Sequence, residues 1–186
     1  MQIDAVVINA SPLITFFRSG QANLLPQLFK RIVVPQAVWQ EVVQDDWDDP
    51  PARELRQQSW PVLESVDISP RVAAWSLGAG ESAVLSYALA HPHLRAVIDD
   101  MDASRCAQTL GIPIFGTGGL LVLAKRRGLL RSVGEAVTKL RSAGLWLSDE
   151  LVQILLAQAG ENASNADFRA VLDSVPNRPP LPGDEP

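Results

Sequence analysis

The sequence contains few of the residues that cross-link small proteins or bind soft metals. Its 186 residues include a single cysteine, Cys106, and two histidines. One cysteine excludes an internal disulfide and a cysteine-based metal centre, which agrees with a reducing compartment. His91 and His93 flank Pro92 in a predicted helix-to-strand loop, and we interpret them as surface residues rather than zinc ligands.

Long apolar runs are also missing. The longest are short pieces such as residues 120–124, whereas a membrane-spanning helix needs about 20 apolar residues. The N-terminal stretch MQIDAVVINAS lacks the basic start and the long apolar segment of a secretory signal. We therefore expect a cytoplasmic protein without a membrane span.

Positive charge is not in excess, since the formal net charge is -5. This balance excludes nucleic-acid binding that depends on global positive charge. The charge is uneven, however, because residues 105–141 contain seven basic residues and one acid, whereas residues 41–67 contain eight acids and two arginines. The basic stretch 125–131 has two interpretations: a surface for a polyanion, or a solvated helix end whose cations complement the helix dipole.

Short β-branched runs alternate with segments of helical spacing along most of the chain. Residues 5–8 form a continuous apolar run that ends in NASP, which is typical of a buried strand turning into a helix. The acidic stretch 45–51 is predicted to be a loop. The other predicted strands are 32–34, 62–66, 96–98 and 113–115, and the predicted helices include 24–29, 52–58, 81–90, 103–110, 120–127, 133–143 and 151–159. This alternation indicates an α/β fold with a parallel sheet and helices on both faces.

Polar residues follow several of the predicted strands, where the binding crevice of a parallel sheet lies. They are Asn9, Ser11, Asp99, Asp100 and Thr117, with Glu81 at a helix start. Each alone has an ordinary interpretation, such as a helix cap or a complement to a helix dipole. Gathered in one crevice, however, the carboxylates would repel one another unless a cation such as Mg²⁺ compensated them.

Four segments together resemble a known family. The segments VVINASPLI (6–14), LFKRIVVPQAVWQEV (28–42), LGAGESAVLSYA (77–88) and AVIDDMDASRCAQTLGIPIFGTGGLLVLAKRRGLL (96–130) closely resemble an uncharacterised prokaryotic branch of PIN-domain-like nucleases. The resemblance runs from about residue 5 to residue 160. It implies a PIN-like three-layer α/β/α fold with a short central parallel sheet. Within it we predict a PIN-like domain over residues 1–147, a C-terminal helical extension over 148–170 and an irregular proline-rich tail over 171–186.

The resemblance also implies a metal-dependent ribonuclease, often the toxin of a toxin–antitoxin pair, that hydrolyses RNA phosphodiesters with one or two Mg²⁺ or Mn²⁺ ions. The family's acidic positions fall on Asn9, Glu41, Glu81, Asp99 and Asp100, the predicted metal ligands, of which the four acids are also the predicted catalytic residues. The predicted substrate-binding residues are Ser11, Thr117, Lys125, Arg126 and Arg127. Asn9 stands where the family usually has aspartate, so the alternative is a degenerate domain that binds RNA or protein without hydrolysis.

RNA, a small antitoxin and a second copy in a homodimer are the expected partners. The apolar face of Leu151, Ile154 and Leu155 is interpreted either as a dock for an antitoxin helix or, as we prefer, as intrachain packing. A different enzyme class is weighed because residues 78–83 fit G-x-G-x-x-A, with Asp99 about 20 residues further on, as in a dinucleotide fold. That fingerprint must follow a strand, whereas residues 69–76 contain a proline and favour a helix.

Overall fold

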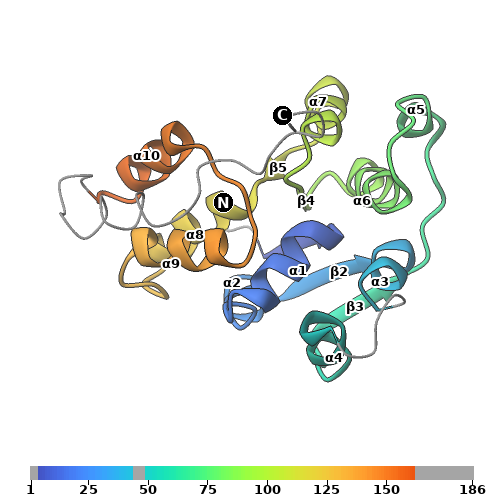
Figure 1. The fold of residues 1–186 in the computed structure, drawn as a ribbon. Coiled ribbons are helices and arrows are strands. Elements are labelled where there is room, and N and C mark those ends of the chain that lie inside the picture. The colour runs from blue at the N-terminus through green and yellow to red at the C-terminus, as the bar shows by residue number, and fades with distance from the viewer. Residues whose placement is uncertain (1–3, 44–48, 162–186) are drawn as a thin grey trace, which may run out of the picture.

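A computed structural model describes residues 4–43 and 49–161 of the chain. Its strands are β1 (Ala5–Ile8), β2 (Arg31–Pro35), β3 (Pro61–Glu64), β4 (Arg95–Val97) and β5 (Ile114–Phe115). They form one parallel sheet in the order β3-β2-β1-β4-β5 (Figure 1). The predicted α/β fold with a short parallel sheet is therefore confirmed.

β1 lies at the centre of the sheet because its sequence suits burial on both faces. Val6, Val7 and Ile8 are fully buried, as the continuous β-branched run predicts. Val7 pairs with Val33 on one side, and Ile8 pairs with Val97 on the other. The end of β1 is therefore fixed against the end of β4.

Helices cover both faces of the sheet. They are α1 (Ala10–Arg18), α2 (Leu24–Leu28), α3 (Gln36–Val43), α4 (Pro50–Arg56), α5 (Pro70–Ala73), α6 (Ala79–Ala90), α7 (Met101–Leu110), α8 (Thr117–Arg126), α9 (Val133–Ser142) and α10 (Asp149–Gln158). The chain moves from β1 to β3 in one direction across the sheet and from β3 to β5 in the other. Because parallel crossovers are right-handed, α1 and α4 cover one face, and α6 and α7 cover the opposite face. Helices α8, α9 and α10 pack on one another at one end of the molecule (Figure 1).

Two proline-containing segments begin helices, which corrects one sequence prediction and excludes an alternative fold. Pro50 and Pro51, expected in a loop, begin α4, because a proline in the first turn of a helix loses no hydrogen bond. Residues 45–48 of the same predicted loop lie outside the described residues. Pro70 begins α5, so a helix and not a strand precedes Gly78, and the dinucleotide fold is excluded. Within the described chain, no helix is long and apolar enough to span a membrane.

The last described residue, Glu161, joins the C-terminal helices. Its carboxylate accepts hydrogen bonds from the backbone N–H groups of Val133 and Gly134, at 2.7 and 3.1 Å, in the first turn of α9. It also pairs with Lys125 of α8 at 3.1 Å. Burial alone would raise the pKa of Glu161, but these interactions outweigh it and hold the pKa below its ordinary value. Glu161 thus caps α9 and ties it to α8.

Glu161→Gln is expected to lower the free energy of unfolding by about 1–2 kcal/mol at pH 7, because charge-assisted hydrogen bonds are replaced by weaker ones. A lowered folded-state pKa means that the carboxylate's contribution is complete above the unfolded-state pKa and is lost as the pH falls through the folded-state value. The difference between the two proteins should therefore stay constant down to about pH 5 and close at lower pH. Urea unfolding from pH 7 to pH 3 measures it. The exposed Glu54→Gln is the control, and an equal loss in both variants would contradict the capping role.

Candidate active site

The crevice expected in this sheet lies between β1 and β4. From β1 the chain leads to β2 on one side, and from β4 it leads to β5 on the other, so the connections diverge at this point. Ligands bind at such switch points, outside the carboxyl ends of the strands. Asn9 follows β1, and its backbone N–H donates to the Val97 carbonyl at 3.0 Å, while Asp99 lies two residues beyond Val97. Neighbouring strands are about 4.8 Å apart, so Asn9 and Asp99 come to the same crevice.

Asn9 occupies the N-cap position of α1 but does not use its side chain as a cap. Its side-chain amide N–H group donates instead to Glu81 Oε1 at 3.3 Å, although the two residues are 72 positions apart in the sequence. The residue is 3 % exposed, and its Oδ1 atom has no hydrogen-bond partner in the structure. Buried polar atoms are nearly always satisfied, so this oxygen marks a place where a ligand would be favourable.

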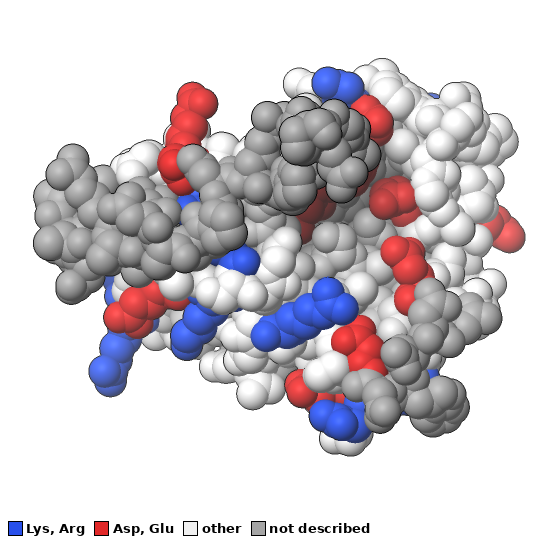
Figure 2. Space-filling view, viewed as in Figure 1, with Lys and Arg blue, Asp and Glu red and all other residues white. Residues whose placement is uncertain are grey.

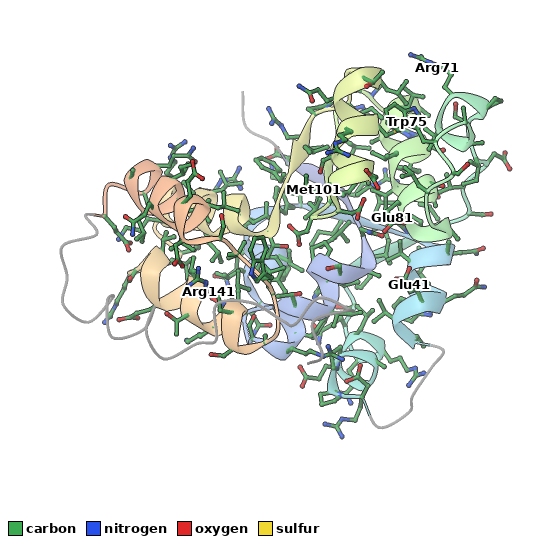
Figure 3. The ribbon with its side chains drawn as sticks, turned by 45° about the horizontal axis from the view of Figure 1, so that its top comes forward. Glu41, Arg71, Trp75, Glu81, Met101 and Arg141 are labelled. Carbon is green, nitrogen blue, oxygen red and sulfur yellow. The ribbon has the colours of Figure 1, made fainter. Side chains whose placement is uncertain are left out.

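Glu41 and Gly80 bring a third segment to the same point. A Cβ atom added to Gly80 would lie 2.7 Å from Glu41 Oε2 and 2.9 Å from Asn9 Oδ1. The two oxygens therefore approach each other over the bare backbone of a glycine in the first turn of α6. Glu81, the next residue, lies in that turn as well. Figure 3 shows Glu41 on α3 and Glu81 on α6, at the edge where these helices meet.

The two adjacent aspartates after β4 have different partners. Asp99 accepts from the Thr117 backbone N–H at 2.7 Å and from the Thr117 hydroxyl at 2.6 Å, so both of its carboxylate oxygens are oriented by the start of α8. Asp100 is exposed and caps α7 by accepting from the Ala103 N–H at 2.8 Å. Burial raises the pKa of Asp99, and the hydrogen bonds from Thr117 counter part of the shift. Asp99 therefore lies in the crevice with its carboxylate positioned, and Asp100 has a structural role as a cap.

These donors suit a hard divalent cation. In the described residues, no three His, Cys, Asp or Glu side chains converge tightly enough to hold a metal by themselves. The convergence consists of an amide oxygen with carboxylates, and Mg²⁺ typically uses only one or two carboxylates because it keeps several waters. The unpartnered Asn9 Oδ1, which faces Glu41 Oε2 over Gly80, therefore fits an ion of this kind. Acidic side chains also surround a hollow on this face of the molecule (Figure 2).

The predicted substrate-binding residues are divided between two places. Ser11 lines a groove beside Glu41, and Thr117 is fully buried beneath Asp99. The three basic residues lie at the other end of α8, about 12–15 Å along the helix from Thr117. There Lys125 pairs with Glu161, the Arg126 guanidinium donates to the Gln158 carbonyl at 3.2 Å, and the Arg127 guanidinium donates to the Leu28 carbonyl. The structure thus does not bring them to the carboxylates.

The apolar face of α10 is partly used within the chain. Leu155 is buried and packs against Gly118 of α8, where an added Cβ would lie 2.5 Å from Leu155 Cδ1. Leu151 and Ile154 are 40 % and 46 % exposed. The preferred interpretation, intrachain packing, therefore describes Leu155 and not the other two.

The fold is that of a parallel α/β domain, a class of proteins that binds ligands at the switch point, outside the carboxyl ends of the strands. The chain belongs to the PIN domain family, whose family model matches residues 5–161. Members of this family are typically nucleases and generally use divalent metals. Comparison with curated proteins gives no match.

Sequence reasoning missed the importance of two residues near the crevice. Gly80 stands out in the sequence only within the G-x-G-x-x-A pattern of residues 78–83, although its missing side chain is what admits the oxygens of Asn9 and Glu41. Arg18 was not singled out, yet it lies in the same groove as Ser11 and Glu41. Helical spacing is the sequence signal that could have linked Arg18 to Ser11, because residues 11, 14, 15 and 18 share one face of α1.

Proposed function

We propose that this chain is a metal-dependent endoribonuclease that hydrolyses RNA phosphodiesters. The observation that carries the proposal is the buried Asn9 Oδ1, which lacks a hydrogen-bond partner and lies with Glu41 Oε2 within 3 Å of one point over Gly80. The chain belongs to a family whose members are typically nucleases, and this membership supports phosphodiester hydrolysis as the reaction class.

The residues that would hold the ion are Asn9, Glu41, Glu81 and Asp99. A bound Mg²⁺ or Mn²⁺, with a second ion when substrate is present, would supply Lewis-acid activation of water and charge compensation at the phosphoryl group. Asp100 is left out of this set, because its exposed side chain already caps α7.

The chain's own groups would prepare this chemistry. Thr117 fixes the orientation of the Asp99 carboxylate through two short hydrogen bonds, as second-layer partners of metal ligands commonly do. The Asn9 amide N–H group holds Glu81 in place at 3.3 Å. Glu41 is exposed, so it can act either as a ligand or as a general base through water. Ser11 would donate to a phosphate oxygen at the mouth of the crevice.

The biological setting remains a proposal that rests on the family. We infer the toxin half of a toxin–antitoxin pair, acting as a homodimer in the cytoplasm and inhibited by a small antitoxin. The exposed Leu151 and Ile154 on α10 are a candidate surface for an antitoxin helix. Arg126, which is exposed at the end of α8, remains a candidate for attracting the RNA backbone from a distance, together with Lys125 and Arg127.

The direct test is RNA cleavage with MnCl₂, with EDTA, and with the Glu81→Gln variant. Cleavage should require Mn²⁺ and fall about 10²-fold in Glu81→Gln, because the amide keeps the hydrogen-bonding shape but loses the charge. Glu150→Gln is the matched control, since Glu150 is also a first-turn glutamate but is exposed on α10. Equal cleavage under all of these conditions would mean that the activity comes from a contaminant or from another site.

The second candidate function is RNA or protein binding without hydrolysis. It is favoured by the absence, among the described residues, of three acidic or histidine side chains that converge as a metal site, and by the neutral Asn9. Binding of Mn²⁺, measured by isothermal titration calorimetry, separates the two functions. If no ion binds at millimolar concentration while RNA still binds, the chain is a binding module.

A further inference from the structure

A groove of about 280 Å³ lies beside the proposed site. Its floor is the exposed face of α1, with Ser11, Ile14 and Arg18 along it. Glu41 of α3 forms one wall, and the connection between α9 and α10, including Leu145, forms the other. In Figures 1 and 3, α1 likewise lies between α3 and α9. The groove thus begins at a residue of the proposed site and leads away from it.

The far wall of the groove is held in place from within the protein. Arg141, whose side chain is 8 % exposed, donates to the Leu147 carbonyl at 2.5 Å and to Asp149 Oδ1 at 2.7 Å (Figure 3). These bonds tie the end of α9 to both the connection and the start of α10. Gly144 has a φ of +96°, which a residue with a side chain would adopt only with strain. The groove is therefore bounded by a fixed segment.

Arg18 is the basic residue among those that line the groove, and Glu41 is the acidic one. The Arg18 side chain is 50 % exposed, and its Nη2 atom lies 3.3 Å from Oδ2 of Asp49, whose side chain is 30 % exposed. Exposed ion pairs of this kind contribute little to stability, so a phosphate can replace the carboxylate at low cost. Arg18 is seven residues beyond Ser11, or about 10 Å along α1. An RNA strand that is cleaved at the crevice would therefore reach Arg18 through the groove.

We propose that this groove binds the backbone of single-stranded RNA next to the cleaved bond, and that Arg18 binds a phosphate there after leaving Asp49. This inference rests on the proposed function and specifies its substrate. The volume is at the small end for a ligand site, which suits a single strand rather than a duplex. Ile14 and Leu145 add apolar surface against which a ribose or base can pack.

The experiment measures binding and cleavage separately. Binding of a fluorescein-labelled single-stranded RNA is followed by anisotropy in EDTA, and KM and kcat are measured in MnCl₂. Arg18→Ala should raise Kd and KM about tenfold, leave kcat within about twofold, and reduce the slope of log K against log salt by about 0.7. Asp49→Asn should lower Kd about twofold, because Arg18 no longer has to leave a carboxylate.

The pair of variants distinguishes binding from a structural role, since a purely structural ion pair would make both substitutions act in the same direction. Arg31→Ala is the matched control: the Arg31 side chain is 49 % exposed and pairs with Glu64 at 2.8 Å and with the Tyr87 hydroxyl at 3.1 Å, and Arg31 begins β2 at the amino end of the sheet, away from the crevice. An Arg18→Ala effect no larger than that of Arg31→Ala, or weaker binding by Asp49→Asn, would overturn the inference while leaving hydrolysis intact. Arg18-dependent binding by a protein that does not cleave RNA in Mn²⁺ would support the groove and overturn the proposed hydrolysis.

Discussion

Asp99→Asn is expected to lower RNA cleavage about 10³-fold, because it removes the charge of a carboxylate that both Thr117 donors orient in the crevice. The loss corresponds to about 4 kcal/mol of transition-state stabilisation. Stability should change little, since an asparagine at position 99 still accepts one Thr117 hydrogen bond and burial penalises the charged form of the native side chain. Single-turnover cleavage in MnCl₂, together with urea unfolding, measures both effects.

The neighbouring residue is the control for this prediction. Asp100 caps α7, and asparagine is as good an N-cap as aspartate, so Asp100→Asn should keep cleavage within about twofold of the unmodified chain. The two variants make the same chemical change one residue apart. Loss of activity in Asp100→Asn with activity kept in Asp99→Asn would reverse the assignment of the two side chains.

Asn9→Asp should make the stability of the protein depend on a divalent cation. In EDTA the new carboxylate is buried beside Glu81, loses the amide donor to Glu81 Oε1 and approaches Glu41, so the free energy of unfolding should fall by about 3 kcal/mol. An ion that compensates the added charge should bind at least tenfold more tightly than in the unmodified chain. At 100 times its Kd, a ligand stabilises the folded state by about 2.7 kcal/mol, so saturating Mn²⁺ should restore most of the loss.

Thermal unfolding with EDTA and with MnCl₂ checks this prediction. The expected result is a Mn²⁺-induced rise in Tm that is several degrees larger for Asn9→Asp than for the unmodified chain. Asn23→Asp is the control, because Asn23 is exposed at the N-cap of α2 and should respond to neither condition. Equal stability of Asn9→Asp in both solutions would mean that no ion binds near position 9.

The sequence predicts the strands and helices well where its local signals are strong. Residues 5–8 form β1 as predicted. The four apolar residues specify the strand, and the sequence NASP that follows them specifies the turn into α1. The signal fails at Pro50 and Pro51, since proline is common both in loops and in the first turn of helices. Only the tertiary packing of α4 on α1 decides between these possibilities.

The site is predictable as a set of residues but not in its geometry. The position of residues after parallel strands brings Asn9 and Asp99 together by topology alone. Choosing between Asp99 and Asp100 needs the turn after β4, which directs one side chain to Thr117 and the other to the start of α7. Arg18 could not be assigned from the sequence, because the α9–α10 connection that completes its groove is more than 120 residues away in the chain.

The glycine at position 80 has a consequence for how such a site is lost over time. Alanine there would favour α6 by about 0.5–1 kcal/mol, so helix propensity does not protect the glycine. Its methyl group would nevertheless occupy the space over which Asn9 and Glu41 meet. Replacing Gly80 with alanine would thus disrupt the site without weakening the helix that contains it. A relative that carries a larger residue at this position would keep the architecture but lose the arrangement of oxygens on which the proposed RNA cleavage depends.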